Sequence, residues 1–226
     1  MKKLSLLPVL AFLFSLGACV EGNTVKKSTG RMRIINASYI SGGANIDVDY
    51  KTVYASLTEY LNYSLFREYL AGRHPVQVRN GAGSIVIDTA VNIDENGSYS
   101  LVIFDSSNAI RCRIVQENFQ VPVGSTCKVR FLNLSNDAPY VDVFQEIGSA
   151  PAFDSLYRGM YTGYYTFGVK QTYFTVKDAV NGNLLYTQSP WEMQPGFFYT
   201  MFLKGNSGSL GTDSLGLFVI GNNGEY

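Results

Sequence analysis

A motif that occurs twice constrains the fold more than any other feature of the sequence. Residues 31–38 read Arg-Met-Arg-Ile-Ile-Asn-Ala-Ser, and residues 128–135 read Lys-Val-Arg-Phe-Leu-Asn-Leu-Ser. Both consist of a basic residue, any residue, Arg, two apolar residues, Asn, any residue and Ser, and Arg33 and Arg130 lie 97 residues apart (130 − 33). Self-similarity at a fixed offset indicates a chain built from copies of one folding unit.

Further segments match in the same order along the chain. The matching pairs are 46–48 with 141–143, 76–79 with 174–177, and 97–100 with 196–200. Their offsets differ by a few residues, as expected when loop lengths differ between two copies of one unit. We therefore predict two tandem domains, residues 31–122 and 123–226, joined at Val121-Pro122-Val123-Gly124.

Each copy has the pattern of short β-strands. Runs of β-branched and aromatic residues bounded by Gly and Asn predict about seven strands in the first copy, at 33–36, 46–50, 60–66, 75–79, 84–91, 99–104 and 110–116. The 22 Gly, 16 Tyr and 14 Phe suit strands joined by tight turns. Residues 52–67 are ambiguous and also fit a short helix. We expect an all-β chain in which each domain is an antiparallel β-sandwich.

The repeated motifs resemble a known family. Arg-x-x-Asn-x-Ser, then Val-Asp-Val, then a later Gly-x-x-Tyr-Thr strand are similar to the domain of unknown function 4397. The second copy is closer, with Asn133 to Pro139 followed by Val141-Asp142-Val143, whereas the first departs after Ser38. The resemblance covers nearly all of the mature chain and implies immunoglobulin-like or transthyretin-like sandwiches. The family has no assigned activity.

The N-terminus resembles the signal of a bacterial lipoprotein. Lys2 and Lys3 precede an apolar run, residues 4–16, that is too short to span a bilayer. Leu16-Gly17-Ala18-Cys19 then resembles a lipobox, in which the cysteine is acylated and becomes the mature N-terminus. The alternative is an ordinary secretory signal followed by a chance cysteine.

These features predict a signal peptide at residues 1–18, a lipidated Cys19 and a flexible polar tether over residues 19–30. We expect an exported protein anchored by its lipid to the outer membrane, facing either the periplasm or the cell surface. With the richness in Tyr and Asn, the chain looks like a lipoprotein of the Bacteroidetes.

Charge and residue counts argue against several functions. The 18 basic and 18 acidic residues become 16 and 18 without residues 1–18, a net charge of −2, so we expect no nucleic-acid partner. His74 is the only histidine, and a Ser–His–Asp or Cys–His arrangement would depend on it. Three cysteines, one lipidated, cannot form a four-thiolate zinc site, and there is no glycine-rich phosphate loop.

We therefore expect no enzyme, no catalytic residues, no metal and no cofactor. A pair of carboxylates, as in glycosidases, stays formally possible.

Asp47 and Asp142 recur between the copies, as do Arg33 and Arg130. One interpretation is that each aspartate binds a cation or ligand. The other, which we favour, is structural: each aspartate accepts hydrogen bonds from the arginine of the first strand or from a loop backbone.

Cys112 and Cys127 form a candidate disulfide in an oxidising compartment. A bridge would close a loop of about 15 residues across the domain joint and contribute about 3 kcal/mol. Alternating apolar residues on both sides of each cysteine instead favour two thiols that point into separate cores. The sequence leaves both possibilities open.

An aromatic cluster in the second copy is a candidate ligand site, and its members are Tyr157, Tyr161, Tyr164, Tyr165 and Trp191. Aromatic faces beside hydroxyl and amide groups suit sugar recognition. The same residues also suit a strand whose alternate side chains fill a core. Three short Asp-Ser/Thr-apolar sequences resemble O-glycosylation acceptors of the Bacteroidetes, at Thr89, Ser155 and Ser214.

Together these features predict a non-enzymatic, lipid-anchored envelope protein that acts as a binding or adhesion module for an unknown protein or glycan. One alternative is a structural or assembly component of a surface complex or fimbria. Another is a glycan-binding lipoprotein for nutrient capture.

Overall fold

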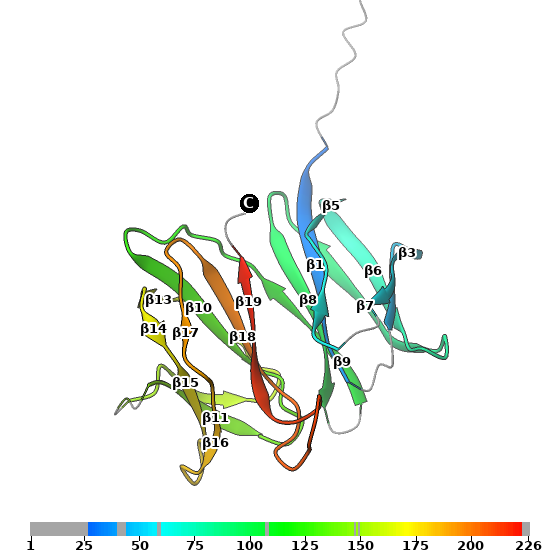
Figure 1. Cartoon of the computed structure of the whole chain (residues 1–226). Helices are drawn as coiled ribbons and strands as arrows, with labels where there is room; N and C mark the ends of the chain where they lie inside the picture. Colours follow the sequence, from blue (N-terminus) through cyan, green and yellow to red (C-terminus); the bar gives the residue numbers. More distant parts are fainter. Residues whose placement is uncertain are drawn as a thin grey trace, which may run out of the picture.

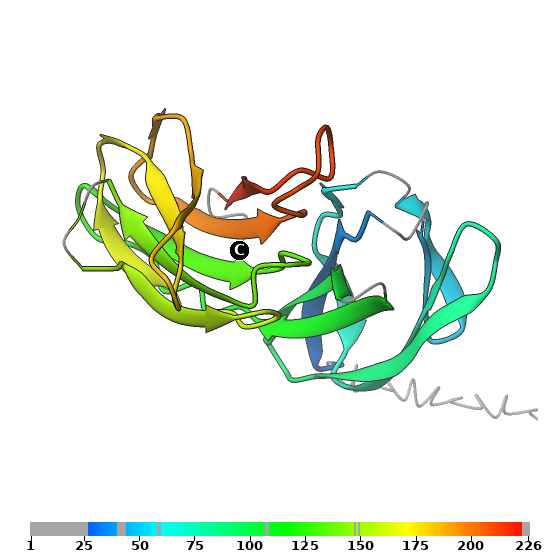
Figure 2. The same ribbon diagram turned by 90° about the horizontal axis from the view of Figure 1, so that it is seen from below.

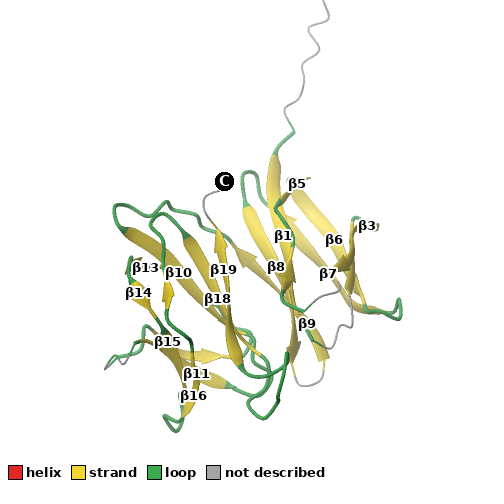
Figure 3. Cartoon of the chain, in the orientation of Figure 1, coloured by secondary structure: helices red, strands yellow, loops and turns green. Residues whose placement is uncertain are grey.

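The computed structural model describes residues 27–39, 44–57, 60–106, 109–146, 148 and 150–222, and all regular secondary structure in these residues is β-strand (Figure 3). The signal peptide, Cys19 and the tether up to residue 26 lie outside the described residues. In the described part of the chain, no helix meets the length and apolarity needed to cross a membrane. The expectation of an all-β chain is confirmed.

Two sheets form the first half of the molecule. Sheet A has the order β4-β1-β8-β9, with β5 also paired to β1, and comprises β1 (Thr29–Ala37), β4 (Asn62–Tyr63), β5 (Arg67–Leu70), β8 (Ser98–Ser106) and β9 (Ala109–Gln116). Sheet B has the order β3-β2-β6-β7 and comprises β2 (Ala44–Val48), β3 (Lys51–Leu57), β6 (Gly72–Arg79) and β7 (Ile85–Ile93). Alternate apolar residues of both sheets, such as Ile34, Ile46 and Leu101, fill one buried core between them.

The second half repeats this arrangement. Sheet C has the order β13-β10-β18-β19 and comprises β10 (Thr126–Asn133), β13 (Tyr165–Gly168), β18 (Phe198–Lys204) and β19 (Gly216–Asn222). Sheet D has the order β12-β11-β15-β16 and comprises β11 (Tyr140–Gln145), β12 (Phe153–Tyr157), β15 (Phe174–Asp178) and β16 (Leu184–Thr187). A two-stranded ribbon joins β14 (Gln171–Thr172) to β17 (Trp191–Glu192). The two halves stand side by side (Figure 1).

Two strand pairs correct the expectation of purely antiparallel sheets. β1 pairs with β8 in parallel, and β10 pairs with β18 in parallel, whereas the other strand pairs described are antiparallel. β1 and β10 carry the arginine and asparagine of the repeated Arg-x-x-Asn-x-Ser motif, and β8 and β18 carry the tyrosine of the later matching segment. In each half these two strands therefore run side by side in the same direction. Parallel neighbours need a long crossover, and in each half the intervening strands of sheet B or D provide it.

Residues 52–57 form β3, and residues 62–63 form β4, so the helical alternative for this segment is wrong where the structure describes it. Val53 and Tyr54 pack against the core of the first half. β-Branched and aromatic side chains favour a strand with one face against a core over a helix.

A third apolar core joins the two halves. Its buried members come from both copies and are Ile35, Ala37, Val102, Phe104, Val115, Leu132, Leu134, Phe202 and Ile220. Those that lie in strands alternate with residues that face the core of their own half, such as Ile34 and Phe131. The outer faces of sheets A and C thus pack on each other, as the view from below shows (Figure 2).

Candidate binding cleft at the junction of the two halves

A buried charge network lies where the two halves meet. Glu117 directly follows β9, and its Oε1 accepts hydrogen bonds from Arg33 Nη2 at 3.2 Å and from Arg130 Nη2 at 2.6 Å. The Ser100 hydroxyl donates to the same oxygen, and the Tyr164 hydroxyl donates to Glu117 Oε2 at 3.1 Å. The side chains of Glu117, Arg33 and Arg130 are at most 2% exposed. One carboxylate therefore neutralises arginines from both copies.

The pKa values in this network follow from burial and charge. Burial by itself would raise the pKa of Glu117, but the charges of Arg130 and Arg33 and the hydrogen bonds that it accepts outweigh burial and hold its pKa below the ordinary range. Burial also lowers the pKa of Arg33 and raises the pKa of Tyr164 to about 12. The network at neutral pH is therefore an ionised carboxylate, two guanidinium ions and a neutral phenol.

The two repeated arginines are fixed in the same way in both halves. Arg33 Nε donates to the Ser100 hydroxyl at 2.8 Å, and Arg130 Nε donates to the Thr200 hydroxyl at 3.0 Å. Each hydroxyl belongs to the residue paired with the arginine on the parallel neighbouring strand. The parallel pairing thus orients both guanidinium groups toward Glu117.

The repeated aspartates do not contact these arginines, which corrects the favoured interpretation in part. Asp47 accepts hydrogen bonds from Thr52 Oγ1 at 2.7 Å and from Arg79 Nε at 2.8 Å. Asp142 accepts from the backbone N–H of Ser155 at 2.7 Å, so its donor is a backbone group, but one in strand β12 and not in a loop. The reason is geometric: Arg33 is on the outer face of sheet A, whereas Asp47 alternates with the core residues of sheet B.

The Asn-x-Ser part of the repeat shapes the turn after the first strand. The Oδ1 atoms of Asn36 and Asn133 accept hydrogen bonds from the backbone N–H groups of Ser38 and Ser135, at 3.1 and 3.2 Å. Asn133 Nδ2 also donates to the carbonyl oxygens of Ala138 and Leu156, both at 3.0 Å. These buried asparagines thus provide hydrogen-bond partners for backbone groups of the turn and of β12.

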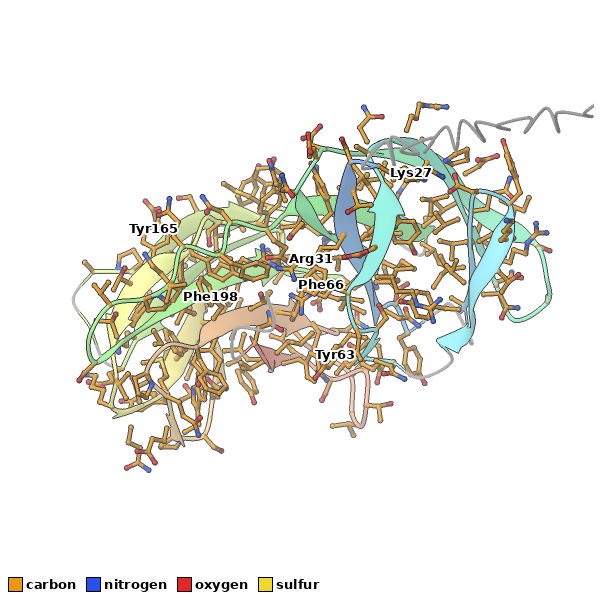
Figure 4. The ribbon with its side chains drawn as sticks, turned by 90° about the horizontal axis from the view of Figure 1, so that it is seen from above. Lys27, Arg31, Tyr63, Phe66, Tyr165 and Phe198 are labelled. Atoms are coloured by element: carbon orange, nitrogen blue, oxygen red, sulfur yellow. The ribbon has the colours of Figure 1, made fainter. Side chains whose placement is uncertain are left out.

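A cleft of about 540 Å³ opens beside the charge network. Its lining residues come from β1, from the segment around β4 and β5, from the connection between the halves and from the end of β19: Arg31, Arg33, Tyr63, Ser64, Leu65, Phe66, Arg67, Glu68, Phe119, Gly221 and Asn222. Arg31 and Phe66 lie together between the two halves in the view from above (Figure 4). This volume is within the range of small-molecule sites, which favour the interfaces between domains.

Stacked arginines form one wall of the cleft. The Arg31 guanidinium carbon lies 5.0 Å from the ring centroid of Phe66 and 5.8 Å from that of Phe119, and Arg31 Nε donates to the Ser98 hydroxyl at 2.8 Å. The Arg33 guanidinium carbon lies 4.9 Å from the ring centroid of Phe66. Such cation–π contacts hold the guanidinium groups in place.

Asn222 also lines the cleft, next to Arg33. Its Oδ1 accepts a hydrogen bond from Arg33 Nη1 at 2.9 Å, whereas its Nδ2 is buried and makes no hydrogen bond with the residues that the structure describes. Leaving a buried N–H donor without an acceptor is costly. The cleft is therefore lined by a residue whose buried amide lacks an acceptor among the described residues, next to Arg33.

Sequence analysis did not identify Glu117, Phe66, Phe119 or Asn222 as site residues. A usable signal existed only for Glu117, the one acidic residue in the otherwise uncharged stretch 117–124 that joins the copies. The other three are ordinary strand or loop residues, and only the packing of one half on the other brings them together.

The predicted aromatic set does not form one platform. Tyr165 packs on Phe153 and Trp191 on Tyr199, with ring centroids 5.1 and 4.7 Å apart, beside the core of the second half. Tyr157 is half exposed on sheet D, paired with Tyr140. Figure 4 shows Tyr165 far from the junction, on the second half. The alternation of strand residues between two faces separates neighbours in sequence.

Two members of the set do come together. Tyr161 and Tyr164 line a hollow of about 270 Å³, whose other residues are Gln116, Asn118, Gln120, Lys128, Arg130, Thr162 and Gly163. Tyr164 is also part of the charge network, and its ring lies over the Arg130 guanidinium at 4.7 Å. Tyr164, a candidate ligand residue from its sequence, therefore has a structural role.

Cys112 and Cys127 are free thiols in the structure. Cys112 packs against the core of the first half, and Cys127 is buried in the core of the second. Burial raises the pKa of the Cys112 thiol and raises that of Cys127 to about 11. The geometry therefore corresponds to two separate cores and not to a bridge.

The remaining candidates are spread over the surface. Thr89 is half-buried on β7, Ser155 is exposed on β12, and Ser214 is half-buried before β19, with its hydroxyl donating to the Gly211 carbonyl. Their glycosylation stays a prediction. His74 contacts Asp49 Oδ2 at 2.8 Å and the Leu70 carbonyl oxygen at 2.7 Å, outside the cleft. Among the described residues, no three His, Cys, Asp or Glu side chains gather as metal ligands.

Comparison with known families identifies the chain. The sequence model of the family described as Domain of unknown function (DUF4397) matches residues 30–144, which are 115 of the 226 residues (144 − 30 + 1). The chain belongs to this family. The match to DUF4397 runs from β1 to β11 and thus crosses the joint between the copies, but it ends earlier than the nearly complete coverage expected from the motifs.

Other comparisons add little to the DUF4397 assignment. No curated protein matches the chain in sequence. A solved structure described as "Alpha-glucan binding by a streptococcal virulence factor" matches with 13% identity over 76% of this chain and 92% of that chain, at a TM-score of 0.27. Neither fold nor ligand is inferred from a similarity of this size.

Proposed function

We propose that this DUF4397 protein is a non-enzymatic, lipid-anchored protein of the cell envelope that acts as a binding module. The cleft at the junction of the two halves is its ligand site. The observation that carries the proposal is the combination in one concave site of stacked Arg31 and Arg33 with the unsatisfied amide of Asn222. Pre-arranged polar groups in a hollow of this size are typical of binding sites.

Rigid support of the cleft strengthens this proposal. Arg33 is held by Ser100, Glu117 and Asn222, so its position is fixed before any ligand arrives. Beneath the cleft the two halves share a buried apolar core. A site held by packing and hydrogen bonds loses little conformational entropy on binding.

A bulky side chain at the cleft mouth tests the binding function. Leu65 lines the cleft and is 74% exposed, so Leu65→Trp fills space without disturbing a core. Leu210, 95% exposed in a different loop, gives the matched control Leu210→Trp. Wild type and both variants are applied to an array of glycans and of extracellular and envelope proteins.

We expect a ligand that binds the wild type and Leu210→Trp but not Leu65→Trp. Equal binding by all three proteins would reject the cleft as the site, and no binding to any member would reject the binding module. Anchoring is tested separately by palmitate labelling, which Cys19→Ala should abolish.

A second candidate function, an assembly role in the envelope, is favoured by the place of the cleft. Arg31 is two residues from Thr29, the first residue of β1. Thr29 lies ten positions after Cys19 (29 − 19), a reach of at most about 35 Å. A lipid on Cys19 would therefore keep the cleft near the membrane, beside other proteins anchored there.

Protease accessibility on intact and lysed cells separates the two functions. Digestion on intact cells would support a surface module for adhesion. Protection until lysis would reject adhesion and favour assembly with periplasmic partners.

A further inference from the structure

The lining of the cleft is rich in hydrogen-bond donors and positive charge. Arg31, Arg33 and Arg67 line it, with Glu68 as the acidic lining residue and Glu117 buried beneath. Glu117 is already shared between Arg33 and Arg130. Three arginines and one acidic side chain thus line the cleft, and this composition favours an anionic ligand.

The buried amide of Asn222 points to the same chemistry. Its Nδ2 needs an acceptor, and its neighbour Arg33 is a cation whose Nη1 already donates to the Asn222 Oδ1. A carboxylate oxygen satisfies an N–H donor and is attracted by a guanidinium at the same time. A neutral ligand would supply only the first of these interactions.

The two phenylalanine rings of the cleft do not offer an open platform for a sugar, whereas Tyr63, which also lines the cleft, is 44% exposed. Phe66 lies under both Arg31 and Arg33, with distances of 5.0 and 4.9 Å from its centroid. Phe119 lies against Arg31 and also contacts Phe198 edge to face, with centroids 5.2 Å apart. These two rings therefore do not favour a stacked saccharide as the ligand that carries the carboxylate.

Two sheet edges border the cleft instead. β4 and β5 form one edge of sheet A, and β19 is an edge strand of sheet C. Ser64 to Glu68 line the cleft from the first edge, and Gly221 and Asn222 line it from the second. Edge strands present main-chain N–H and C=O groups that an extended peptide can pair with.

We propose that the cleft binds an extended acidic segment of a partner protein. Its main chain runs along the edge of β19, and a carboxylate reaches Arg31 and the Nδ2 of Asn222. This inference rests on the proposed binding function and names the ligand class for the same site.

Titration with defined peptides tests the inference. The probe is a peptide of about ten residues in which Glu and Thr alternate, and the control probe carries Gln in place of each Glu. Binding to the purified protein is measured by calorimetry at two salt concentrations. We expect the Glu peptide to bind at least about tenfold more tightly than the Gln peptide, and more weakly as salt rises.

Two cleft variants and one control variant locate the site. Arg31→Gln should weaken binding of the Glu peptide at least about tenfold, whereas Arg111→Gln should leave it unchanged. Arg111 is exposed and pairs with Phe104 near the end of β8, while Arg31 pairs with Ser98 at its start. Asn222→Ala provides a second test of the site that does not depend on the folding of Arg31→Gln.

The contrary outcomes are distinct. Equal affinity for the Glu and Gln peptides would overturn the carboxylate, and equal affinity of wild type and both cleft variants would overturn the site. Binding of an oligogalacturonate without binding of the Glu peptide would replace the peptide by an acidic saccharide. Binding of neither probe, together with a ligand from the array that Leu65→Trp abolishes, would reject this inference and leave the proposed function intact.

Discussion

Arg33 and Arg130 occupy the same position in the two copies of the repeat, and both donate a hydrogen bond to Oε1 of Glu117. The carboxylate lies on the segment that joins the copies, so one acidic residue serves both. Without it, two guanidinium groups would face each other in a buried interface. The segment that connects the halves thus also supplies the counter-ion for Arg33 and Arg130 at their interface.

Replacing Glu117 tests this role. Glu117→Gln keeps the shape of the side chain but leaves Arg33 and Arg130 buried without a counter-ion, so the free energy of unfolding should fall by about 3–5 kcal/mol. The measurement is urea denaturation. Glu95→Gln, at an exposed position, should change the free energy by less than about 0.5 kcal/mol. Equal effects of both substitutions would contradict the role of Glu117.

The pH dependence of stability follows from the same residue. The pKa of Glu117 is depressed in the folded state, because the arginine charges and hydrogen bonds outweigh burial. Its stabilisation is therefore fully present above the unfolded glutamate pKa of about 4.3 and is lost as pH falls through the folded pKa. Denaturation between neutral pH and about pH 3 measures this loss. The part due to Glu117 should be absent in Glu117→Gln, and an unchanged pH profile in that variant would contradict the assignment.

Asn133 should be essential to the turn that ends the motif strand. Asn133→Ala removes three hydrogen bonds, those to the carbonyl groups of Ala138 and Leu156 and the one from the N–H of Ser135. Unsatisfied buried groups cost about 1–3 kcal/mol each, partly offset by relaxation and water, so we expect a loss of about 2–4 kcal/mol. Thermal denaturation compares it with Asn92→Ala at an exposed position of β7. A melting temperature within a degree or so of the wild type would show that the turn does not need the amide.

The two halves should unfold together. Leu132 is 1% exposed in the core shared by sheets A and C, and Leu132→Ala should cost about 2–5 kcal/mol through lost packing. Calorimetry should show one cooperative transition for the wild type, shifted as a whole in the variant. Two transitions, of which Leu132→Ala moves only one, would show instead that the copies are independent domains.

The thiols of Cys112 and Cys127 should be unreactive in the native protein. Burial raises both pKa values, that of Cys127 to about 11, so little thiolate forms at pH 8. Iodoacetamide should modify them slowly in native buffer and fully in urea, as measured by intact mass. A mass that stays two hydrogens lower until a reductant is added would reveal a disulfide and contradict the structure.

Part of the site could be predicted from the sequence. The repeat marked Arg33 and Arg130 as equivalent residues, and strand periodicity favoured separate cores for Cys112 and Cys127 while leaving a bridge open. Spacing did not reveal the partner of the arginines, because Asp47 recurs with Arg33 in sequence but lies on the opposite face of the sandwich. Recurrence shows that two residues belong to one unit, and it does not show that they touch.

What the sequence alone determined is the local pattern: short strands, their turns and a motif present twice, each set by side-chain alternation and by residues within a few positions. The tertiary structure decided that β1 and β8 run in parallel and that the outer faces of sheets A and C pack on each other. It also brought Arg31, Phe66, Phe119 and Asn222 to one cleft. These relationships join residues up to nearly 200 positions apart, and they depend on which apolar faces become buried when the whole chain folds.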